Sequence, residues 1–214
     1  MLKVPFYEET TNYSCGAASA LMILRFFKKI KLTRKNEFEL WKEALALPFK
    51  FSSVEGLASL IARRKLKVTV ITKVKKPTFS ELKIPLKYEN ISKNKKKEDL
   101  EYYKFYKNIQ LTSAKQAGVK FISRKPILAD VIASLKNGQL VLILIDDWWL
   151  RKFIWKDDLN HVIHWIVAIG FETGFISVVD PAYGKIKIPI KAFQKLMNLE
   201  RHIKMQSAII KVSK

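Results

Sequence analysis

Cysteine is almost absent from this chain, which has one such residue, Cys15, among 214. A disulfide within the chain is therefore impossible, and a zinc site built from several cysteines is excluded. We accordingly expect no metal and no cofactor. A single thiol is consistent with a reducing compartment, so we expect a cytoplasmic protein.

Long hydrophobic runs are also missing. The longest, residues 140–145, has the length of a β-strand and falls far short of the roughly 18 apolar residues that cross a bilayer. The first residues include Pro5, Glu8 and Glu9, where the apolar stretch of a secretory signal would lie. The sequence therefore predicts a soluble protein with no transmembrane segment.

Acidic residues are scarce relative to basic ones, at 19 against 40, which gives a formal net charge of +21. Such a charge attracts nucleic acids, acidic membrane surfaces and acidic protein segments. Lysine-rich surfaces are also common in heat-adapted proteins and in organisms with biased genomes, and we favour this simpler explanation. The charge is also suited to steering acidic substrates towards the protein.

The basic residues are concentrated in one part of the chain. Residues 61–97 contain thirteen lysines and arginines against two glutamates, a net charge of +11, and aromatic residues follow at Tyr102, Tyr103, Phe105 and Tyr106. Basic and aromatic side chains together can bind single-stranded nucleic acid. We do not favour a nucleic-acid partner, because aromatics at helical spacing more often pack in a core and no nucleic-acid-binding motif is present.

What the chain does contain suits one folded domain. Hydrophobic residues make up 49% of it, which is enough for a single core, and its length leaves little room for a second domain. We therefore expect one domain over residues 1–214.

Hydrophobic periodicity and turn residues indicate helices first and mostly strands afterwards. We predict helices at residues 14–27, 34–45, 54–64, 99–117, 126–135 and 190–199, and strands at 66–74, 119–122, 139–145, 164–171, 175–180, 184–189 and 207–212. Residues 73–97 are predicted to be mainly a surface loop. The pattern predicts an α+β fold, with a helical half followed by an antiparallel sheet.

Two features precede the strand at residues 164–171. Trp148 and Trp149 follow the 139–145 strand, and we expect them to pack as a corner on the sheet rather than to line a substrate cleft. Residues 150–160 come next, and we hypothesise that they form a lid.

Cys15 is predicted to lie in the first turn of a helix capped by Ser14. A helix N-terminus carries partial positive charge and free N–H groups, which favour a thiolate over a thiol. Gly16 has no side chain and so lets another group approach the thiol closely. A lone cysteine is more often a small buried hydrophobic residue, so Cys15 alone does not define a site.

His164 opens the predicted strand at residues 164–171, where an imidazole can protrude from the sheet edge into a cleft. His161, three residues earlier, is a competing candidate. We favour His164 because it leads the apolar run directly. By itself such a histidine is more often structural than a general base.

Asp180 closes the predicted strand at residues 175–180. A carboxylate there can accept a hydrogen bond from an imidazole, orient it and stabilise its charged form. Aspartate before proline is also common in turns. Because His164 opens one strand of the predicted antiparallel pair and Asp180 closes the other, we expect the two side chains at the same edge of the sheet.

Three segments resemble the motifs of a known family and occur in the same order. They are residues 12–19 around Cys15, residues 164–170 from His164, and residues 178–184 around Asp180. They are similar to the bacteriocin-processing peptidases, which act on double-glycine leaders, and to the stand-alone relatives of these enzymes in the papain-like cysteine peptidase superfamily. The resemblance covers most of the chain and is weakest over residues 73–97.

This resemblance implies a papain-like fold and a Cys-His-Asp triad. Cys15 would be the nucleophile, His164 the base and Asp180 the residue that orients the base. The thiolate would attack the carbonyl carbon of a peptide or isopeptide bond and form an acyl-enzyme, which water hydrolyses. The backbone N–H of Cys15 would donate one hydrogen bond to the oxyanion.

One position departs from the family. Six residues before the cysteine, the family usually has a glutamine whose amide donates to the oxyanion, whereas this chain has Glu9. An ionised carboxylate only accepts hydrogen bonds. Either burial keeps Glu9 protonated so that it donates, or another donor such as Asn12 replaces it, or the site is weakened or inactive. Loss of one donor costs about two to three orders of magnitude in rate, so activity can survive it.

We therefore predict a cysteine peptidase that acts on a peptide or protein substrate. One alternative is a thiol-dependent acyltransferase, in which an amine intercepts the acyl-enzyme. Another is a catalytically weakened papain-like module that binds a peptide without cutting it.

Overall fold

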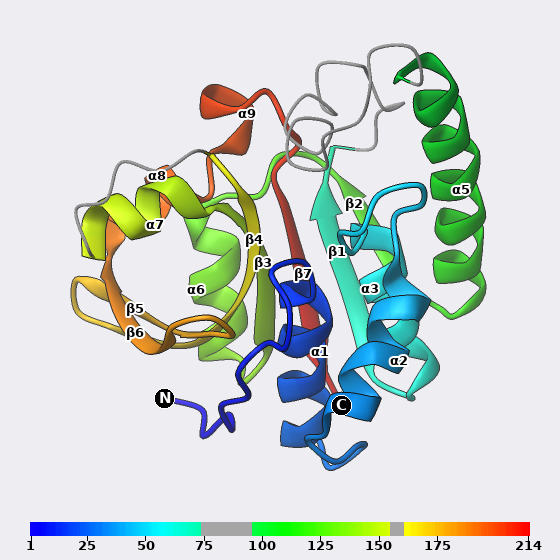
Figure 1. Cartoon of the computed structure of the whole chain (residues 1–214). Helices are drawn as coiled ribbons and strands as arrows, with labels where there is room; N and C mark the ends of the chain where they lie inside the picture. Colours follow the sequence, from blue (N-terminus) through cyan, green and yellow to red (C-terminus); the bar gives the residue numbers. More distant parts are fainter. Residues whose placement is uncertain (74–95, 155–160) are drawn as a thin grey trace.

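The computed structural model describes residues 1–73, 96–154 and 161–214, and Figure 1 shows their arrangement. A seven-stranded sheet with the strand order β2-β1-β7-β3-β4-β5-β6 forms the centre. Only the β1–β2 pair is parallel, and the other neighbouring pairs are antiparallel. The strands are β1 (Lys67–Thr72), β2 (Lys120–Ser123), β3 (Leu140–Asp146), β4 (Ile163–Glu172), β5 (Phe175–Asp180), β6 (Gly184–Pro189) and β7 (Ala208–Ser213).

Helices cover both faces of the sheet (Figure 1). One side carries α1 (Cys15–Phe26), α2 (Arg34–Ala44), α3 (Val54–Arg63) and α5 (Lys96–Gln116), and the other carries α6 (Leu128–Lys136) and α8 (Ile190–Leu196). Two shorter helices, α7 (Asp147–Ile154) and α9 (Leu199–His202), complete the described set. Within the described ranges, no helix is both long and apolar enough to cross a membrane.

Alternating residues of the central strands enter two separate cores. In β3, Leu142 packs in the core that contains α1 and α3, whereas Val141 and Ile143 pack in the core that contains α6 and α8. All seven residues of β3 are buried. Burial on both faces explains why the sequence of this strand is almost continuously apolar.

The α+β class that the sequence predicts is confirmed, and the predicted strands from residue 139 to residue 189 correspond to β3, β4, β5 and β6. The C-terminal helix is shorter than expected, because α8 ends at Leu196 and α9 follows as a separate helix. Most of the basic stretch at residues 61–97 and the second half of the hypothesised lid lie outside the described residues.

The short helix α7 occupies residues for which we expected a corner and the start of a lid. Its beginning is stabilised by Asp146, whose Oδ1 accepts a hydrogen bond from the backbone N–H of Trp148 at 3.2 Å. Tryptophan is a weaker helix former than alanine or leucine. The paired tryptophans therefore concealed this helix in the sequence.

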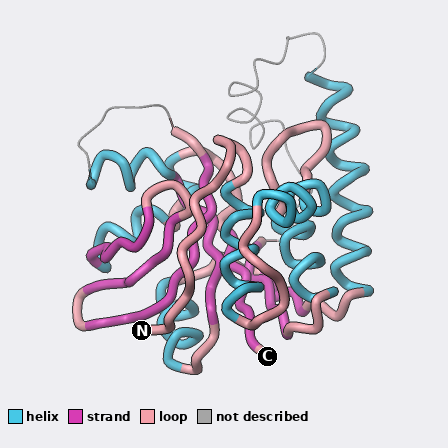
Figure 2. The backbone as a smooth tube through the Cα atoms, turned by 60° about the horizontal axis from the view of Figure 1, so that its bottom comes forward, coloured by secondary structure: helices cyan, strands magenta, loops and turns pink. Residues whose placement is uncertain are grey.

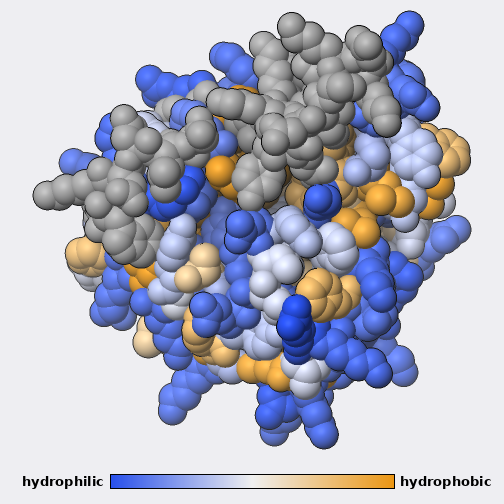
Figure 3. Space-filling view, in the orientation of Figure 1, coloured by the Kyte–Doolittle hydropathy of each residue, from blue (hydrophilic) through white to orange (hydrophobic). Residues whose placement is uncertain are grey.

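The aromatic residues of α5 do not all pack as expected. Tyr103 contacts Phe49, with ring centroids 5.5 Å apart. Tyr102 and Phe105 are 51% and 63% exposed, so the expectation of core packing was wrong for these two. Figure 3 shows hydrophobic side chains on the α5 side of a face that is otherwise mostly hydrophilic. One of the two arguments against a nucleic-acid partner is thereby removed, whereas the lack of a recognisable motif is unaffected.

The N-terminal segment runs beside β4 before α1 begins (Figures 1 and 2). The backbone N–H of Leu2 donates to the carbonyl oxygen of Ile169 at 2.8 Å, and that of Glu9 donates to the carbonyl oxygen of Pro181 at 3.0 Å. These bonds place residue 9 between the end of β5 and the start of α1.

Candidate active site

Cys15 is the first residue of α1, at the end of the helix where backbone N–H groups lack partners within the helix. Its side chain is buried, at 7% exposed. The helix is tied to β4, because Ser19 Oγ donates a hydrogen bond to the carbonyl oxygen of Trp165 at 3.0 Å. The thiol therefore has a defined position relative to β4.

His164 and Asp180 are in direct contact, and both are buried. His164 Nε2 lies 2.9 Å from Asp180 Oδ1, and the same oxygen accepts a hydrogen bond from the backbone N–H of Ala182 at 2.8 Å. Because Nε2 faces the carboxylate, Nδ1 is the ring nitrogen left for Cys15.

This contact is diagonal rather than directly across the two strands. The β4–β5 ladder ends with the pair Val167 and Val179, after an irregularity between Ala168 and Gly170. If this register is continued, Asp180 lies opposite residue 166, two positions beyond His164. Diagonal neighbours of this kind are still within reach of long or aromatic side chains.

The charges around His164 favour its protonated form. Burial disfavours an imidazolium, but the interactions of His164 with Asp180 and Cys15 outweigh burial and raise the pKa of His164 well above its ordinary value of 6.5. An imidazolium beside a thiolate is one way in which proteins activate a cysteine nucleophile.

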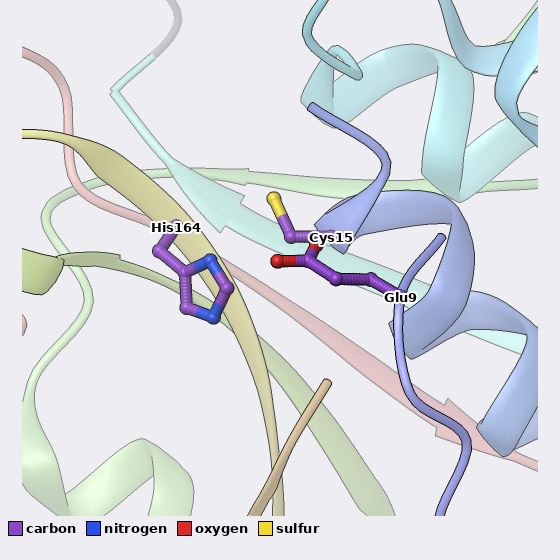
Figure 4. A group of neighbouring side chains, drawn as sticks. All are labelled: Glu9, Cys15 and His164. Atoms are coloured by element: carbon purple, nitrogen blue, oxygen red, sulfur yellow. The ribbon is translucent and has the colours of Figure 1, made fainter. Parts of the chain in front are cut away.

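Glu9 completes a group of three side chains that face one another (Figure 4). One potential ligand atom from each of Glu9, Cys15 and His164 lies within 4.8 Å of the other two. Burial raises the pKa of Glu9 to about 7, opposed by the positive charge of His164 and reinforced by the negative charge of Asp180. Near neutral pH, a substantial fraction of Glu9 is therefore protonated and able to donate a hydrogen bond.

Glu37 in α2 holds the segment that leads to the thiol. Its side chain is fully buried. Its Oε1 accepts from the backbone N–H of Thr10 at 2.9 Å and from Ser14 Oγ at 2.7 Å. Its Oε2 accepts from the hydroxyl group of Tyr7 at 3.0 Å and from Thr10 Oγ1. One carboxylate thus fixes both the N-terminal loop and the residue directly before Cys15.

Sequence reasoning missed Glu37. Glutamate is usually exposed, and Glu39 and Glu43 on the same helix gave no reason to single it out. Its burial results from the N-terminal loop, which is distant in the sequence and packs over this position.

The sequence also suggested Gly16 and Asn12 as supporting residues of the site, and the structure places neither of them as Glu9 is placed, facing both Cys15 and His164. A Cβ atom at Gly16 would lie 2.8 Å from Ser52 Cβ and 3.0 Å from Trp165 Cδ1. The close approach at Gly16 is therefore made by these two residues, which seat α1 on the sheet. Asn12 is exposed in the turn before α1.

His161, the competing histidine, belongs to a second histidine–aspartate pair. Its Nδ1 lies 2.7 Å from Oδ2 of the buried Asp146, and its ring lies 5.0 Å from the ring of Trp148. The structure thus gives the two candidate histidines different carboxylates and places Asp180 with His164.

Asp147 and Tyr183 add a further polar pair near His164. The Tyr183 hydroxyl donates to Asp147 Oδ2 at 3.4 Å, and Arg151 Nε lies 3.0 Å from the same oxygen. Burial and the charge of Asp147 raise the pKa of Tyr183 to about 12, so this hydroxyl stays protonated. Sequence reasoning missed this pair, because only the fold brings α7 to the turn after β5.

The α1 helix that begins at the cysteine and the antiparallel strands that carry the histidine and the aspartate form a papain-like cysteine peptidase fold. The model of the Peptidase_C39 like family matches residues 4–210, so the chain belongs to this family. The predicted resemblance to this group of peptidases is thereby confirmed.

Solved structures that are similar to the chain include two peptidases. A C39-like peptidase from Bacillus anthracis is 14% identical, with 100% of this chain and 96% of that chain covered and a TM-score of 0.54. A double-glycine motif protease from an AMS/PCAT transporter, solved in complex with the leader peptide, is 15% identical, with 99% and 94% covered and a TM-score of 0.49. Among curated proteins, none matches the sequence.

Proposed function

We propose that this chain is a cysteine peptidase that hydrolyses a peptide or isopeptide bond through Cys15, His164 and Asp180. One observation carries the proposal: the 2.9 Å contact between His164 Nε2 and Asp180 Oδ1 leaves the other ring nitrogen for a thiol at a helix N-terminus. Membership of a peptidase-like family supports it. We further propose that residues 1–214 form one domain, since strands from β1 to β7 join in one sheet.

The reaction would start from the thiolate–imidazolium pair. The Cys15 sulfur attacks the carbonyl carbon, and the electrons of the C=O double bond move to the oxygen. The C–N bond then breaks, and His164 gives its proton to the leaving amine. His164 next takes a proton from water, and the resulting hydroxide adds to the carbonyl carbon of the thioester. The C–S bond then breaks, which releases the carboxylic acid and restores the Cys15 thiolate beside the His164 imidazolium.

Protonated Glu9 would donate a hydrogen bond to the oxyanion, and the backbone N–H of Cys15 would donate a second one. Two features support this role: the backbone N–H of Glu9 is bonded to Pro181, and its carboxyl group has a pKa of about 7. The exposed Asn12 is a weaker candidate for the donor.

A peptide-binding module that does not hydrolyse its ligand is the second candidate. Glu9 is the observation that favours it, because above about pH 7 its carboxylate would repel an oxyanion. Acyl transfer would use the same acyl-enzyme, with an amine in place of water.

The decisive test is the rate of Cys15 alkylation by iodoacetamide as a function of pH. We expect the wild-type thiol to react well below pH 8.5, the approximate pKa of a free thiol. We expect His164→Ala to react only as the pH approaches that value. His161→Ala, which removes the histidine of the other pair, should behave as the wild type. The shape of each pH profile is compared rather than the absolute rate, because we expect burial of the thiol to slow alkylation in every variant.

If all three proteins react only near pH 8.5, the proposed ion pair does not exist and the binding module becomes the better hypothesis. If the ion pair exists, incubation with a peptide mixture separates the remaining possibilities. New peptide termini that form with the wild type and not with Cys15→Ser indicate hydrolysis, and new amide products indicate acyl transfer.

A further inference from the structure

The three side chains in Figure 4 combine the donor types that bind zinc. Cys15 offers a thiolate, His164 an imidazole nitrogen and Glu9 a carboxylate oxygen, all within 4.8 Å of one another. Three protein ligands and an open fourth position are typical of zinc sites that are not purely structural. The scarcity of cysteine excludes a site built from several thiolates, but it does not exclude a mixed site.

The distances between the three ligand atoms suit an ion with tetrahedral coordination after a small movement of the side chains. Zinc–ligand bonds of about 2.0–2.3 Å place the ligand atoms of a tetrahedral site about 3.5 Å apart. Because no two of these atoms are more than 4.8 Å apart, each separation would shorten by at most roughly 1 Å. Among the described residues, Glu9 Oε2 is buried without a hydrogen-bond partner, so its movement towards an ion breaks no hydrogen bond of that oxygen.

The surroundings of His164 already resemble the outer shell of a metal site. A histidine that binds a metal through one nitrogen usually donates from the other to a carboxylate, which fixes its orientation. His164 Nε2 has this partner in Asp180, and the carboxylate is held by the backbone N–H of Ala182. The remaining nitrogen, Nδ1, is directed at Cys15.

The local charge also favours a cation, although the whole chain is strongly basic. Glu9 interacts electrostatically with three further carboxylates: those of Asp180, Glu37 and Asp147. Of these, Asp147 is paired with Arg151, and Glu37 is bonded to neutral groups. A divalent cation that binds three ligands here also reduces the mutual repulsion of these carboxylates.

We propose that Glu9, Cys15 and His164 bind Zn²⁺ and that the bound ion blocks the thiol. The ion would displace into solvent the proton held between Cys15 and His164 and, where Glu9 is protonated, the proton of its carboxyl group. It would occupy the sulfur atom and Nδ1, so that the thiol attacks neither a carbonyl carbon nor an alkylating reagent. Inhibition of hydrolysis rests on the proposed function, whereas binding is measured without a substrate, so either proposal can fail alone.

Binding is tested on the whole metal-free chain. Zn²⁺ is titrated in competition with a chromophoric chelator, and Co²⁺ is titrated as a spectroscopic probe. We expect one equivalent of metal and a sulfur-to-cobalt charge-transfer band that Cys15→Ser lacks. Glu9→Gln keeps the size of the side chain but removes the anionic donor, and it should weaken Zn²⁺ binding by at least about tenfold. Asp180→Asn, which changes the outer shell, should weaken it by about ten- to hundredfold.

His161→Ala is the matched control, because it removes a histidine paired with a carboxylate outside the proposed site, and it should leave Zn²⁺ affinity unchanged. Circular dichroism checks whether each variant is folded. If Glu9→Gln does not fold, Asp180→Asn serves as the test. Zn²⁺ should also slow iodoacetamide labelling of the wild type more than that of Glu9→Gln. The proposal is overturned if cobalt binds without a thiolate band, if neither variant weakens Zn²⁺ binding, or if His161→Ala abolishes it.

Discussion

Under the proposed function, Glu9 stands where the resemblance implies a glutamine, and burial keeps its carboxyl group partly protonated near neutral pH. Its pKa of about 7 lies well above the ordinary value of 4.5, because burial disfavours the charged form. Below about pH 7 the side chain can donate a hydrogen bond much as a glutamine does, and above it the side chain becomes an acceptor only.

The variant Glu9→Gln tests whether activity depends on the proton of Glu9. We expect the kcat/KM of the wild type to fall as the pH rises through about 7, because the protonated donor is lost. One pH unit above the pKa, about one-tenth of the carboxyl group is protonated, so Glu9→Gln should be about tenfold more active near pH 8 and similar near pH 6. The pH profile of peptide hydrolysis measures this, with His161→Ala as the control that keeps the fall. If kcat/KM of Glu9→Gln also falls as the pH rises through about 7, the fall is caused by the titration of another group.

The same pKa has a consequence for stability. An acid whose pKa is raised by folding binds more protons in the folded state, so its contribution to stability is present below the unfolded pKa, near 4.5, and is lost as the pH rises through about 7. The Tm of the wild type should therefore fall relative to that of Glu9→Gln between about pH 4.5 and 8. Parallel Tm curves would show that Glu9 is not buried as described.

Glu37 is the second residue whose replacement should have a large effect. In Glu37→Gln, one side-chain oxygen becomes an NH₂ group and faces donors from the N-terminal loop. We expect a loss of about 2–3 kcal/mol in the free energy of unfolding and slower Cys15 alkylation near neutral pH. Denaturant unfolding and the alkylation profile measure the two effects.

Glu39→Gln is the matched control, because Glu39 lies on the same helix, is exposed and, among the residues that the structure describes, pairs only with the exposed Lys42. Its effect should stay within about 0.5 kcal/mol. Equal effects of the two substitutions would show that Glu37 does not anchor the loop.

Among the elements, the docking of α1 on β4 sets the distance between Cys15 and His164. The contact is close at Gly16, where an added Cβ would meet Ser52 and Trp165 at 2.8–3.0 Å. A side chain at this position must push the start of the helix away from the strand, because the neighbouring atoms are already packed.

Gly16→Ala should therefore destabilise the protein by about 1–3 kcal/mol and reduce the reactivity of Cys15 near neutral pH. Ser52→Gly removes the nearest atoms and should restore part of both losses in the double variant. A double-mutant cycle on unfolding free energy and on alkylation rate measures the coupling. Purely additive effects would contradict a contact between these positions.

Sequence patterns predicted some elements better than others. The strands β3 to β6 were anticipated closely, because their apolar runs and turn glycines act over a few residues. The helix α7 was not anticipated, since its first turn depends on the side chain of Asp146 and its sequence contains two tryptophans. The diagonal contact of His164 with Asp180 depends on the irregular β4–β5 register, which no hydrophobic pattern reveals.

For the molecule as a whole, the net charge of +21 contrasts with the carboxylates gathered near Cys15. Hydrophilic side chains project around the outline of the face in Figure 3. An overall positive field attracts an acidic peptide during encounter, and salt weakens this attraction because it shortens the Debye length from about 30 Å at 0.01 M to about 8 Å at 0.15 M.

We therefore expect kcat/KM for a peptide with acidic residues away from the cleavage site to fall by roughly tenfold over this range of salt concentration. As the salt concentration rises, kcat/KM for a neutral peptide of the same length should change little, and kcat/KM for a lysine-substituted peptide should increase. Hydrolysis assays with the three peptides measure this. A common salt response would show that the charge does not select the substrate.

The sequence by itself determined the α+β class, the main strands and the resemblance to a peptidase family, because hydrophobic periodicity, turn residues and short motifs are local properties. It also marked Cys15, His164 and Asp180 as residues to examine together. Only the tertiary structure decided which histidine meets which aspartate, that the half-buried Glu9 side chain lies beside the thiol, and that Glu37 anchors the loop before it. Those properties arise from packing between segments far apart in the chain, and burial is what changes the pKa of Glu9 and hence its chemistry.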